Sequence, residues 1–318
     1  MDKVLISISA FGECGRKPVD LLEKTSLVLI RNTYGRRLQP QEVIDLGKDC
    51  IGMLAGLETL DEKVLTNLPR LKVISRIGTG IDNIDLEAAK RLKIAIYNTP
   101  DAPTQAVAEL AVGLMLDLLR KISMMDRRMR QGGWKRSAGN IIKGKTIGII
   151  GLGRIGKRVA ELLQGLGALI IACDIVQDSS FLKGKDIKMV GMEKLLKNSD
   201  IVSLHLSGTD CVIGNEEINM MKNSAYIINL SRGGILDETA LYNALKDGRI
   251  AGAALDVFRE EPYEGPLKEL DNVILTPHIG SLTRESRAAM ETEAVNNLLA
   301  FLKTGGGDGG AGAKKVMG

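Results

Sequence analysis

The segment "TIGIIGLGRIGKRVAELL" (146–163) constrains the fold more than any other part of the 318-residue chain. An apolar strand pattern leads into three glycines, Gly151, Gly153 and Gly156, and a helix pattern follows. In such a unit the first glycine permits a tight turn, the second lets a phosphate approach the backbone, and the third lets the helix pack on the strand. The segment therefore predicts a strand–turn–helix unit whose helix N-terminus can bind the pyrophosphate of a dinucleotide.

The next strand pattern, "LIIACD" (169–174), supports this interpretation over a purely structural glycine turn. It ends in Asp174, at the distance of about 20 residues where an acidic side chain meets the ribose hydroxyls of a bound dinucleotide. Asp174 would also repel a 2′-phosphate, and no arginine follows it directly. The pattern predicts NAD as the cofactor rather than NADP.

Short apolar runs alternate with helix patterns from one end of the chain to the other, which indicates parallel sheets covered by helices on both faces. The first strand patterns are "VLISIS", "LVLIR", "IGMLAG", "LKVISRIG" and "IAIYNT". A second series begins at "KTIGIIG" and continues with "LIIACD", "DIVSLHL", "AYIINLS", "AGAALDVF" and "NVILT". We predict an α/β protein with two doubly wound parallel-sheet domains joined by long helices over about 104–131 and 283–303. The glycine-rich tail, 304–318, is expected to be disordered.

Composition narrows the class of protein. The chain has 44% hydrophobic and 26% charged residues and a net charge of +4, typical of a globular protein and too small a charge to indicate nucleic-acid binding. Its four cysteines lack paired spacing, so neither a metal site nor a disulfide framework is expected. Without a signal-peptide pattern or an apolar run of about 18 residues, we expect a cytoplasmic protein that does not span a membrane. The basic stretch 120–136 is interpreted as a solvated helix face and a dimer arm.

Four polar features follow strand patterns, where ligands bind in open α/β sheets. They are the backbone around Gly78, Thr79 and Gly80, and the side chains of Arg232, Glu261 and His278. Together they could support hydride transfer. Histidine can accept or donate the hydroxyl proton, a carboxylate beside it favours the imidazolium, and arginine can bind a substrate carboxylate. The backbone N–H groups of residues 78–80 could bind the other end of that carboxylate. The second histidine, His205, is predicted to be structural or to contact the site indirectly.

The motifs "GIIGLGRIGKRVA", "INLSRGGILDETAL", "AALDVFREEP" and "NVILTPHIGSLT" resemble, in order and spacing, those of the D-isomer-specific 2-hydroxyacid dehydrogenases. The likeness extends to about residue 303. It implies a catalytic set of Arg232, Glu261 and His278. It also implies a flavodoxin-like substrate-binding domain, 1–100 with 283–318, and a Rossmann NAD-binding domain, 101–282. Members are typically homodimers acting on small molecules.

Further cofactor contacts come from the same resemblance. It implies that Arg154 and Ile155 contact the cofactor, that Asp256 reaches the nicotinamide amide, and that Thr79, Leu206 and Leu230 line the cofactor pocket. Gly280 is also predicted to lie at the cofactor site, because a glycine leaves room for a cofactor or backbone to come close.

The segments "VLIRNT", "ISRIGTGIDNIDLEAA" and "GGWKR" are most similar to the branch of the family that oxidises D-3-phosphoglycerate for serine biosynthesis. Arg31 and Arg76 would meet a phosphate-bearing substrate, and Arg136 could reach the partner's site in a dimer. Because the chain ends soon after the last helix, no appended regulatory domain is expected. Hydroxypyruvate, glyoxylate and longer keto acids remain open as substrates, as does an NAD-sensing, corepressor-like role. A formate-oxidising relative is disfavoured, since that subgroup is expected to carry glutamine in place of Glu261.

Overall fold

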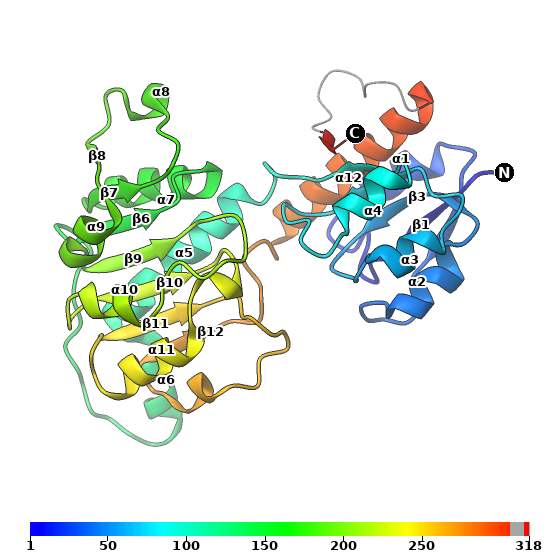
Figure 1. Cartoon of the computed structure of the whole chain (residues 1–318). Coiled ribbons are helices and arrows are strands. Elements are labelled where there is room, and N and C mark those ends of the chain that lie inside the picture. The colour runs from blue at the N-terminus through cyan, green and yellow to red at the C-terminus, as the bar shows by residue number, and fades with distance from the viewer. Residues whose placement is uncertain (306–314, 318) are drawn as a thin grey trace. The chain divides into compact units, whose positions relative to one another are not determined.

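The computed structural model describes residues 1–305 and 315–317 of the chain. The chain divides into two compact units, and each unit is built on its own sheet (Figure 1). Unit 1 comprises Met1–Pro103 together with the chain from Ser281 onward, and unit 2 comprises Thr104–Gly280. The predicted class, two parallel-sheet α/β domains, is confirmed.

Unit 1 contains one sheet in the order β13-β5-β4-β3-β1-β2, in which β1 to β5 are parallel and β13 is antiparallel to β5. The parallel order 2-1-3-4-5 is the flavodoxin-like one, with its switch point between β1 and β3. The strands are β1 (Lys3–Ile6), β2 (Val28–Arg31), β3 (Cys50–Ala55), β4 (Val73–Arg76), β5 (Ala95–Tyr97) and β13 (Lys315–Met317). The helices are α1 (Lys17–Glu23), α2 (Pro40–Gly47), α3 (Glu62–Thr66), α4 (Leu86–Arg91) and α12 (Arg284–Thr304).

Two apolar clusters bury the two faces of this sheet. One joins α2, α3 and α4 to the sheet, and the other joins α1 and α12. The strand β3 is buried along its whole length, as expected for a central parallel strand. Aspartates begin two of the helices, since Asp61 accepts a hydrogen bond from Val64 N at 2.8 Å and Asp85 accepts one from Ala88 N at 2.9 Å.

Unit 2 contains a seven-stranded parallel sheet in the order β12-β11-β10-β9-β6-β7-β8. From β8 to β11 this is the Rossmann order 3-2-1-4-5-6, and its switch point lies between β6 and β9. The strands are β6 (Thr146–Ile150), β7 (Leu169–Cys173), β8 (Ile187–Met189), β9 (Ile201–Leu204), β10 (Tyr226–Asn229), β11 (Gly252–Leu255) and β12 (Val273–Leu275). The helices are α5 (Thr104–Arg120), α6 (Ile122–Arg130), α7 (Arg154–Gly165), α8 (Ser179–Leu182), α9 (Met192–Asn198), α10 (Asn215–Met220) and α11 (Glu238–Lys246), with short 3₁₀ turns η1 (Gly233–Ile235) and η2 (Pro266–Glu269).

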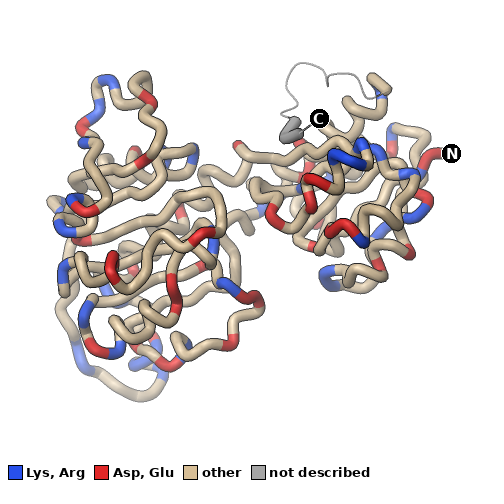
Figure 2. The backbone as a smooth tube through the Cα atoms, in the orientation of Figure 1, with Lys and Arg blue, Asp and Glu red and all other residues tan. Residues whose placement is uncertain are grey.

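Helices cover both faces of this sheet as well (Figure 1). One cluster packs α5 and α7 on the sheet, and the other packs α9, α10 and α11. Charges of both signs are spread along both units (Figure 2). Within the described residues, no helix is both long enough and apolar enough to cross a membrane.

The structure differs from the sequence prediction in three places. The helix expected over 104–131 is two helices, because Lys121 adopts a left-handed conformation (φ 59°) and Asp117 accepts a hydrogen bond from Ser123 N at 2.8 Å across the break. The strand β8 was not predicted, since Lys188 interrupts its short apolar run. In the tail expected to be disordered, residues 306–314 and 318 lie outside the described residues, whereas Lys315–Met317 instead form β13.

Candidate active site

The glycine loop between β6 and α7 has the geometry that a pyrophosphate requires. Gly151 has φ +93°, and a Cβ there would lie 2.5 Å from the carbonyl oxygen of His205. A Cβ on Gly156 would collide with the carbonyl oxygen of Gly151. At Gly153, by contrast, a Cβ would meet nothing within 4 Å, so the N-terminus of the twelve-residue helix α7 faces open space. The residues therefore fit a dinucleotide, whose phosphates would accept hydrogen bonds from the first turn of α7.

This loop lies at the switch point of the sheet. The strand β6, which leads into it, is flanked by β7 and β9. Gly151 N donates to the carbonyl oxygen of Cys173 at 2.9 Å, and His205 N donates to that of Ile150 at 2.8 Å. Leu206 and Leu230, at the ends of β9 and β10, are half-buried and buried respectively.

Asp174 is fixed at the end of β7. Its Oδ2 accepts a hydrogen bond from Leu152 N in the glycine loop at 2.5 Å, and its Oδ1 accepts one from Val176 N at 2.9 Å. Ile175 and Val176 follow it with exposed apolar side chains. The carboxylate is thus held beside the loop, and the next two positions carry no charge.

Glu261 lies beside His278. Its Oε2 and Oε1 are 2.9 and 3.1 Å from Nδ1 of the imidazole. Glu261 Oε1 also accepts a hydrogen bond from Phe258 N at 3.1 Å, which ties the carboxylate to the loop after β11. A carboxylate accepts the Nδ1–H proton, so Nε2 is the ring nitrogen that can exchange a proton with a substrate.

The backbone that carries His278 is strained and is anchored by Asp256. His278 has φ +53°, a left-handed conformation that costs a non-glycine residue on the order of 1 kcal/mol. The buried Asp256 carboxylate accepts hydrogen bonds from Ile279 N at 2.8 Å, Gly280 N at 2.7 Å and Thr276 Oγ1 at 2.6 Å. One buried side chain therefore holds the residues on both sides of the imidazole. A Cβ on Gly280 would lie 3.0 Å from Asp256 Oδ2, so the glycine permits this close approach.

Arg232 follows β10 and is held in an extended conformation. The buried Asn229 donates to the carbonyl oxygen of Arg232 at 2.8 Å and accepts from Ser231 N at 3.0 Å. The Arg232 guanidinium donates to the carbonyl oxygen of Ser231 at 2.7 Å. Since β10, β11 and β12 are consecutive in the sheet, the three segments that carry Arg232, Glu261 and His278 leave it at one edge.

His205 has different surroundings. Its Nε2 is 2.8 Å from Ser203 Oγ, and burial lowers the pKa of His205 to about 4. The imidazole is therefore neutral at physiological pH and suits a structural role better than a proton-transfer role.

In unit 1 the segment Gly78-Thr79-Gly80 follows β4, but one of its three N–H groups is already used. Gly78 N donates to Thr99 Oγ1 at 2.7 Å, which corrects the prediction that this N–H binds a substrate carboxylate. Gly78 has φ +133°, and a Cβ there would collide with the Arg76 guanidinium. The roles of Thr79 and Gly80 stay predictions. Asn98 Nδ2 donates a hydrogen bond to the carbonyl oxygen of Thr79 at 2.7 Å.

The structure does not bring Arg31 and Arg76 together. They end β2 and β4, which β1 and β3 separate, so their backbones lie three strand spacings apart, roughly 14 Å. The Arg76 guanidinium donates to the carbonyl oxygen of Ile77 at 2.7 Å, and Arg31 is exposed. Arg136 belongs to unit 2 and lies in the exposed segment after α6, whereas Arg154 and Ile155 begin α7 beside the glycine loop.

Sequence reasoning missed the residues that position the site. Asn229 and Thr276 each place a polar side chain at the end of an apolar strand, next to a predicted catalytic residue. A polar residue in such a position was a usable signal, since a buried polar group needs a hydrogen-bond partner. Asp256 was predicted only as a cofactor contact, and its hydrogen bonds to the loop that carries His278 were not predicted.

The strand order and the glycine loop at its switch point define unit 2 as a dinucleotide-binding domain. The profile of the family described as "D-isomer specific 2-hydroxyacid dehydrogenase, NAD binding domain" matches residues 112–280. The chain is 38% identical over 271 residues to a glyoxylate reductase of Korarchaeum cryptofilum, an alignment that covers 81% of this chain and 82% of that relative.

A second protein sequence and a solved structure are similar to this chain as well. A D-3-phosphoglycerate dehydrogenase of Methanocaldococcus jannaschii is 40% identical over 274 residues, which is 84% of this chain and 52% of that protein. The solved structure of D-lactate dehydrogenase from Aquifex aeolicus, complexed with NAD and lactic acid, superposes with a TM-score of 0.86 at 29% identity, covering 100% of this chain and 99% of that one. The chain belongs to the D-isomer-specific 2-hydroxyacid dehydrogenases, an NAD-dependent oxidoreductase family, which confirms the predicted family and cofactor.

Asp256→Asn tests the anchoring of the His278 loop. The amide replaces an acceptor oxygen with a donor that faces an N–H or O–H donor, so we expect kcat for keto-acid reduction to fall at least about tenfold, or roughly 1.4 kcal/mol. The Kd of NADH, measured by fluorescence titration, should change less than about threefold, well under the same 1.4 kcal/mol. Thr276→Val removes only one of the three hydrogen bonds and should cost less. Lost NADH affinity at an unchanged kcat would instead favour the predicted nicotinamide contact.

Proposed function

We propose that this protein transfers a hydride between NAD(H) and a small D-2-hydroxy acid, with glyoxylate or hydroxypyruvate as the keto acid that it reduces. The observation that carries the proposal is the contact between His278 Nδ1 and the Glu261 carboxylate at 2.9 Å, at the same sheet edge as Arg232. The name of the Korarchaeum cryptofilum relative, glyoxylate reductase, supports the small keto acid.

The proposal assigns a role to the cofactor and to each of the three side chains. The nicotinamide, when bound, supplies or accepts the hydride at the substrate carbon. His278 Nε2 donates a proton to the carbonyl oxygen during reduction and accepts it from the hydroxyl during oxidation. Glu261 keeps the proton on Nδ1 and stabilises the imidazolium form that the reduction consumes. Arg232 binds the substrate carboxylate or polarises its carbonyl oxygen.

The other predicted contacts complete the proposal. The N–H groups of Thr79 and Gly80 are proposed to bind the substrate carboxylate, and Asp174 is proposed to accept the ribose hydroxyls. The Asp174 carboxylate lies beside uncharged, exposed residues, so it would repel a 2′-phosphate there and Ile175 and Val176 would offer no compensating charge. We propose NAD rather than NADP as the preferred cofactor on this ground.

His278→Ala should lower kcat for glyoxylate or hydroxypyruvate reduction at least about a hundredfold, since a general acid contributes that much or more. Glu261→Gln should lose less, because the ring keeps a hydrogen-bonding partner and loses only the charge. The control is His205→Gln, which changes the other histidine and should leave kcat within about fivefold, under 1 kcal/mol. Near-wild-type turnover by His278→Ala would remove His278 from the mechanism.

D-3-phosphoglycerate is the second candidate substrate. The M. jannaschii relative carries that name, and Arg31 and Arg76 both end strands at the edge of the sheet in unit 1. However, these arginines are separated by roughly three strand spacings, and the Arg76 guanidinium donates to the carbonyl oxygen of Ile77. The geometry therefore favours a small keto acid over one with a phosphate held between the two arginines.

A panel of keto acids with NADH separates the two candidates. We expect kcat/KM for glyoxylate or hydroxypyruvate to exceed that for phosphohydroxypyruvate, and Arg31→Gln to leave the order unchanged. A preference of at least about tenfold for phosphohydroxypyruvate, roughly 1.4 kcal/mol, that Arg31→Gln abolishes would establish the second candidate instead.

We also propose that the chain forms a homodimer through α6 and the segment that follows it. The helix α6 buries none of its residues within the chain. Ile122 and Met129 are 56% exposed, Ile141 is 68% exposed and Trp134 is 81% exposed. Exposed apolar side chains that gather in one segment are typical of a protein–protein interface.

Trp134→Glu should convert a dimer into a monomer at micromolar concentration, because it places a charge in the apolar centre of the proposed interface. Light scattering coupled to size-exclusion chromatography would measure the mass. Leu92→Glu, which changes a 38% exposed leucine of unit 1, is the matched control and should remain dimeric. A monomeric wild-type protein would contradict the proposal.

A further inference from the structure

The turn after β7 is fastened to the glycine loop and to α7 at two points. Asp174 Oδ2 accepts a hydrogen bond from Leu152 N at 2.5 Å, and Asp178 Oδ2 lies 2.5 Å from Lys157 Nζ. Lys157 is the fourth residue of α7, whose N-cap is Gly153, so it projects from the first turn of the helix at the phosphate end. The side chains between the two aspartates, Ile175, Val176 and Gln177, are exposed and uncharged.

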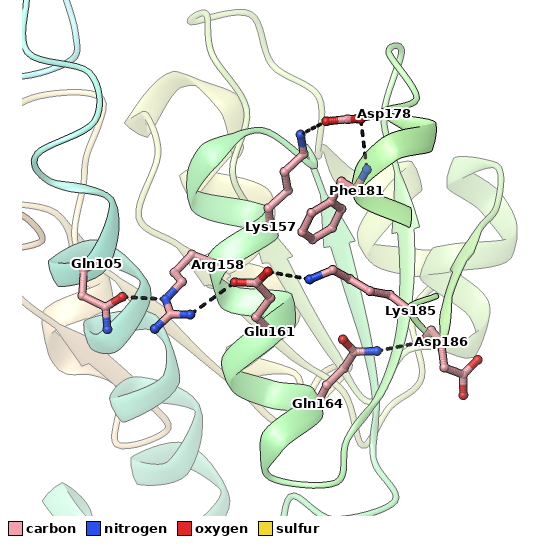
Figure 3. Close-up of polar contacts among 9 residues, drawn as sticks. All are labelled: Gln105, Lys157, Arg158, Glu161, Gln164, Asp178, Phe181, Lys185 and Asp186. Atoms are coloured by element: carbon pink, nitrogen blue, oxygen red, sulfur yellow. Dashed lines mark hydrogen bonds and ion pairs between the residues drawn. The ribbon is translucent and has the colours of Figure 1, made fainter. Parts of the chain in front are cut away.

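Lys157 of α7 is the cation that pairs with this turn, and its ammonium is already bound within the fold. Figure 3 shows its ammonium beside Asp178 and the Phe181 ring. The Lys157 ammonium lies 5.1 Å from the centre of that ring. Only 27% of its side chain is exposed. The lysine holds the pKa of Asp178 well below its usual range, with help from Ser180 and from Phe181 N, so the carboxylate remains charged.

Asp178 also has a structural task. It begins α8, where its Oδ1 accepts hydrogen bonds from Ser180 N and Phe181 N, both at 3.1 Å. The ion pair therefore fixes a short helix over the first turns of α7 and removes the lysine from other anions. Asparagine and serine are also good residues for beginning a helix, so this structural task can be kept while the charge is removed.

A second ion pair lies one helical turn farther from the glycine loop. Lys185 Nζ is 2.5 Å from Glu161 Oε1 and 4.3 Å from the centre of the same Phe181 ring. Arg158 contacts Glu161 at 3.2 Å and Gln105 at 2.5 Å, which completes the polar row along α7 (Figure 3). This pair has the same chemistry as the first pair but a different distance from the glycine loop, so it provides a matched control.

We propose that the Lys157–Asp178 pair is a second determinant of cofactor choice, acting together with Asp174. Discrimination against NADPH would then have two sources: Asp174 repels a 2′-phosphate, and Asp178 withholds the lysine that could bind it. A 2′-phosphate brings about two negative charges, so one flexible lysine released toward it gives a substantial gain in binding. The proposal rests on the dinucleotide site proposed above and adds a role for Lys157 and Asp178.

The test compares the Kd values of NADH and NADPH, measured by nicotinamide fluorescence in the purified protein, and the Kd of 2′,5′-ADP, measured by calorimetry. For Asp178→Asn we expect NADPH and 2′,5′-ADP to bind about tenfold more tightly, roughly 1.4 kcal/mol, while the Kd of NADH stays within about threefold. Asp178→Ser, which also keeps an oxygen to begin α8, should behave in the same way and serves if the first variant folds poorly.

Two controls assign the effect to Lys157. The double variant Lys157→Met with Asp178→Asn should bind NADPH no more tightly than the wild type, because it lacks the cation that Asp178→Asn releases. Glu161→Gln breaks the neighbouring ion pair and should leave the NADPH Kd unchanged. A gain that persists in the double variant, or that appears equally in Glu161→Gln, would overturn the proposal by assigning the effect to another cation or to net charge.

Two other outcomes also count against the proposal. An NADPH Kd that does not change in Asp178→Asn and Asp178→Ser, in proteins that still bind NADH, would overturn the role of the pair and leave the dinucleotide site standing. A wild-type protein that binds neither NADH nor NADPH would remove the dinucleotide site itself, and this proposal with it.

Discussion

The parallel alignment of β10, β11 and β12 is the constraint on which the candidate active site depends. Each strand pairs with its neighbour in register, so all three end at the same edge of the sheet. Arg232, Glu261 and His278 follow these strands and lie 29 and 17 residues apart along the chain. Hydrogen bonds between the strands nevertheless fix where each loop begins. The contact between Glu261 and His278 then needs only short loops of the right conformation.

Buried polar groups hold the loops that carry Arg232 and His278, whereas apolar packing of Phe258 helps to hold the loop that carries Glu261. Asp256 and Asn229 are 1% exposed, and each binds backbone N–H or carbonyl groups of a loop that carries a site residue. An unsatisfied buried carboxylate would cost several kcal/mol, so the hydrogen bonds that satisfy Asp256 also fix the left-handed backbone of His278. Stability and positioning thus depend on the same contacts. They keep His278, the predicted proton-transfer group, in place although 40% of its side chain is exposed.

The sequence predicted what local rules determine. Glycine spacing located the loop at the switch point, and alternating strand and helix patterns gave two parallel sheets, because both signals are set by neighbours along the chain. The break at Lys121 was missed because a charged residue in a helical run carries no signal for a left-handed backbone. The use of Gly78 N by Thr99 and the separation of Arg31 from Arg76 depend on strand order, which no local pattern specifies.

Strand order also has different consequences for the charged side chains of the two units. In unit 1, the order 2-1-3-4-5 places two strands between those that carry Arg31 and Arg76, so the sheet alone cannot gather these charges around one anion. In unit 2, adjacency of β6 and β7 places Leu152 N against Asp174, and side chains then bring Lys157 to Asp178. At the nucleotide end, selectivity can therefore come from which charges are already paired within the fold. The Lys157–Asp178 contact fastens the turn to α7 and neutralises the lysine charge within the fold, so one contact has both a structural and an electrostatic consequence.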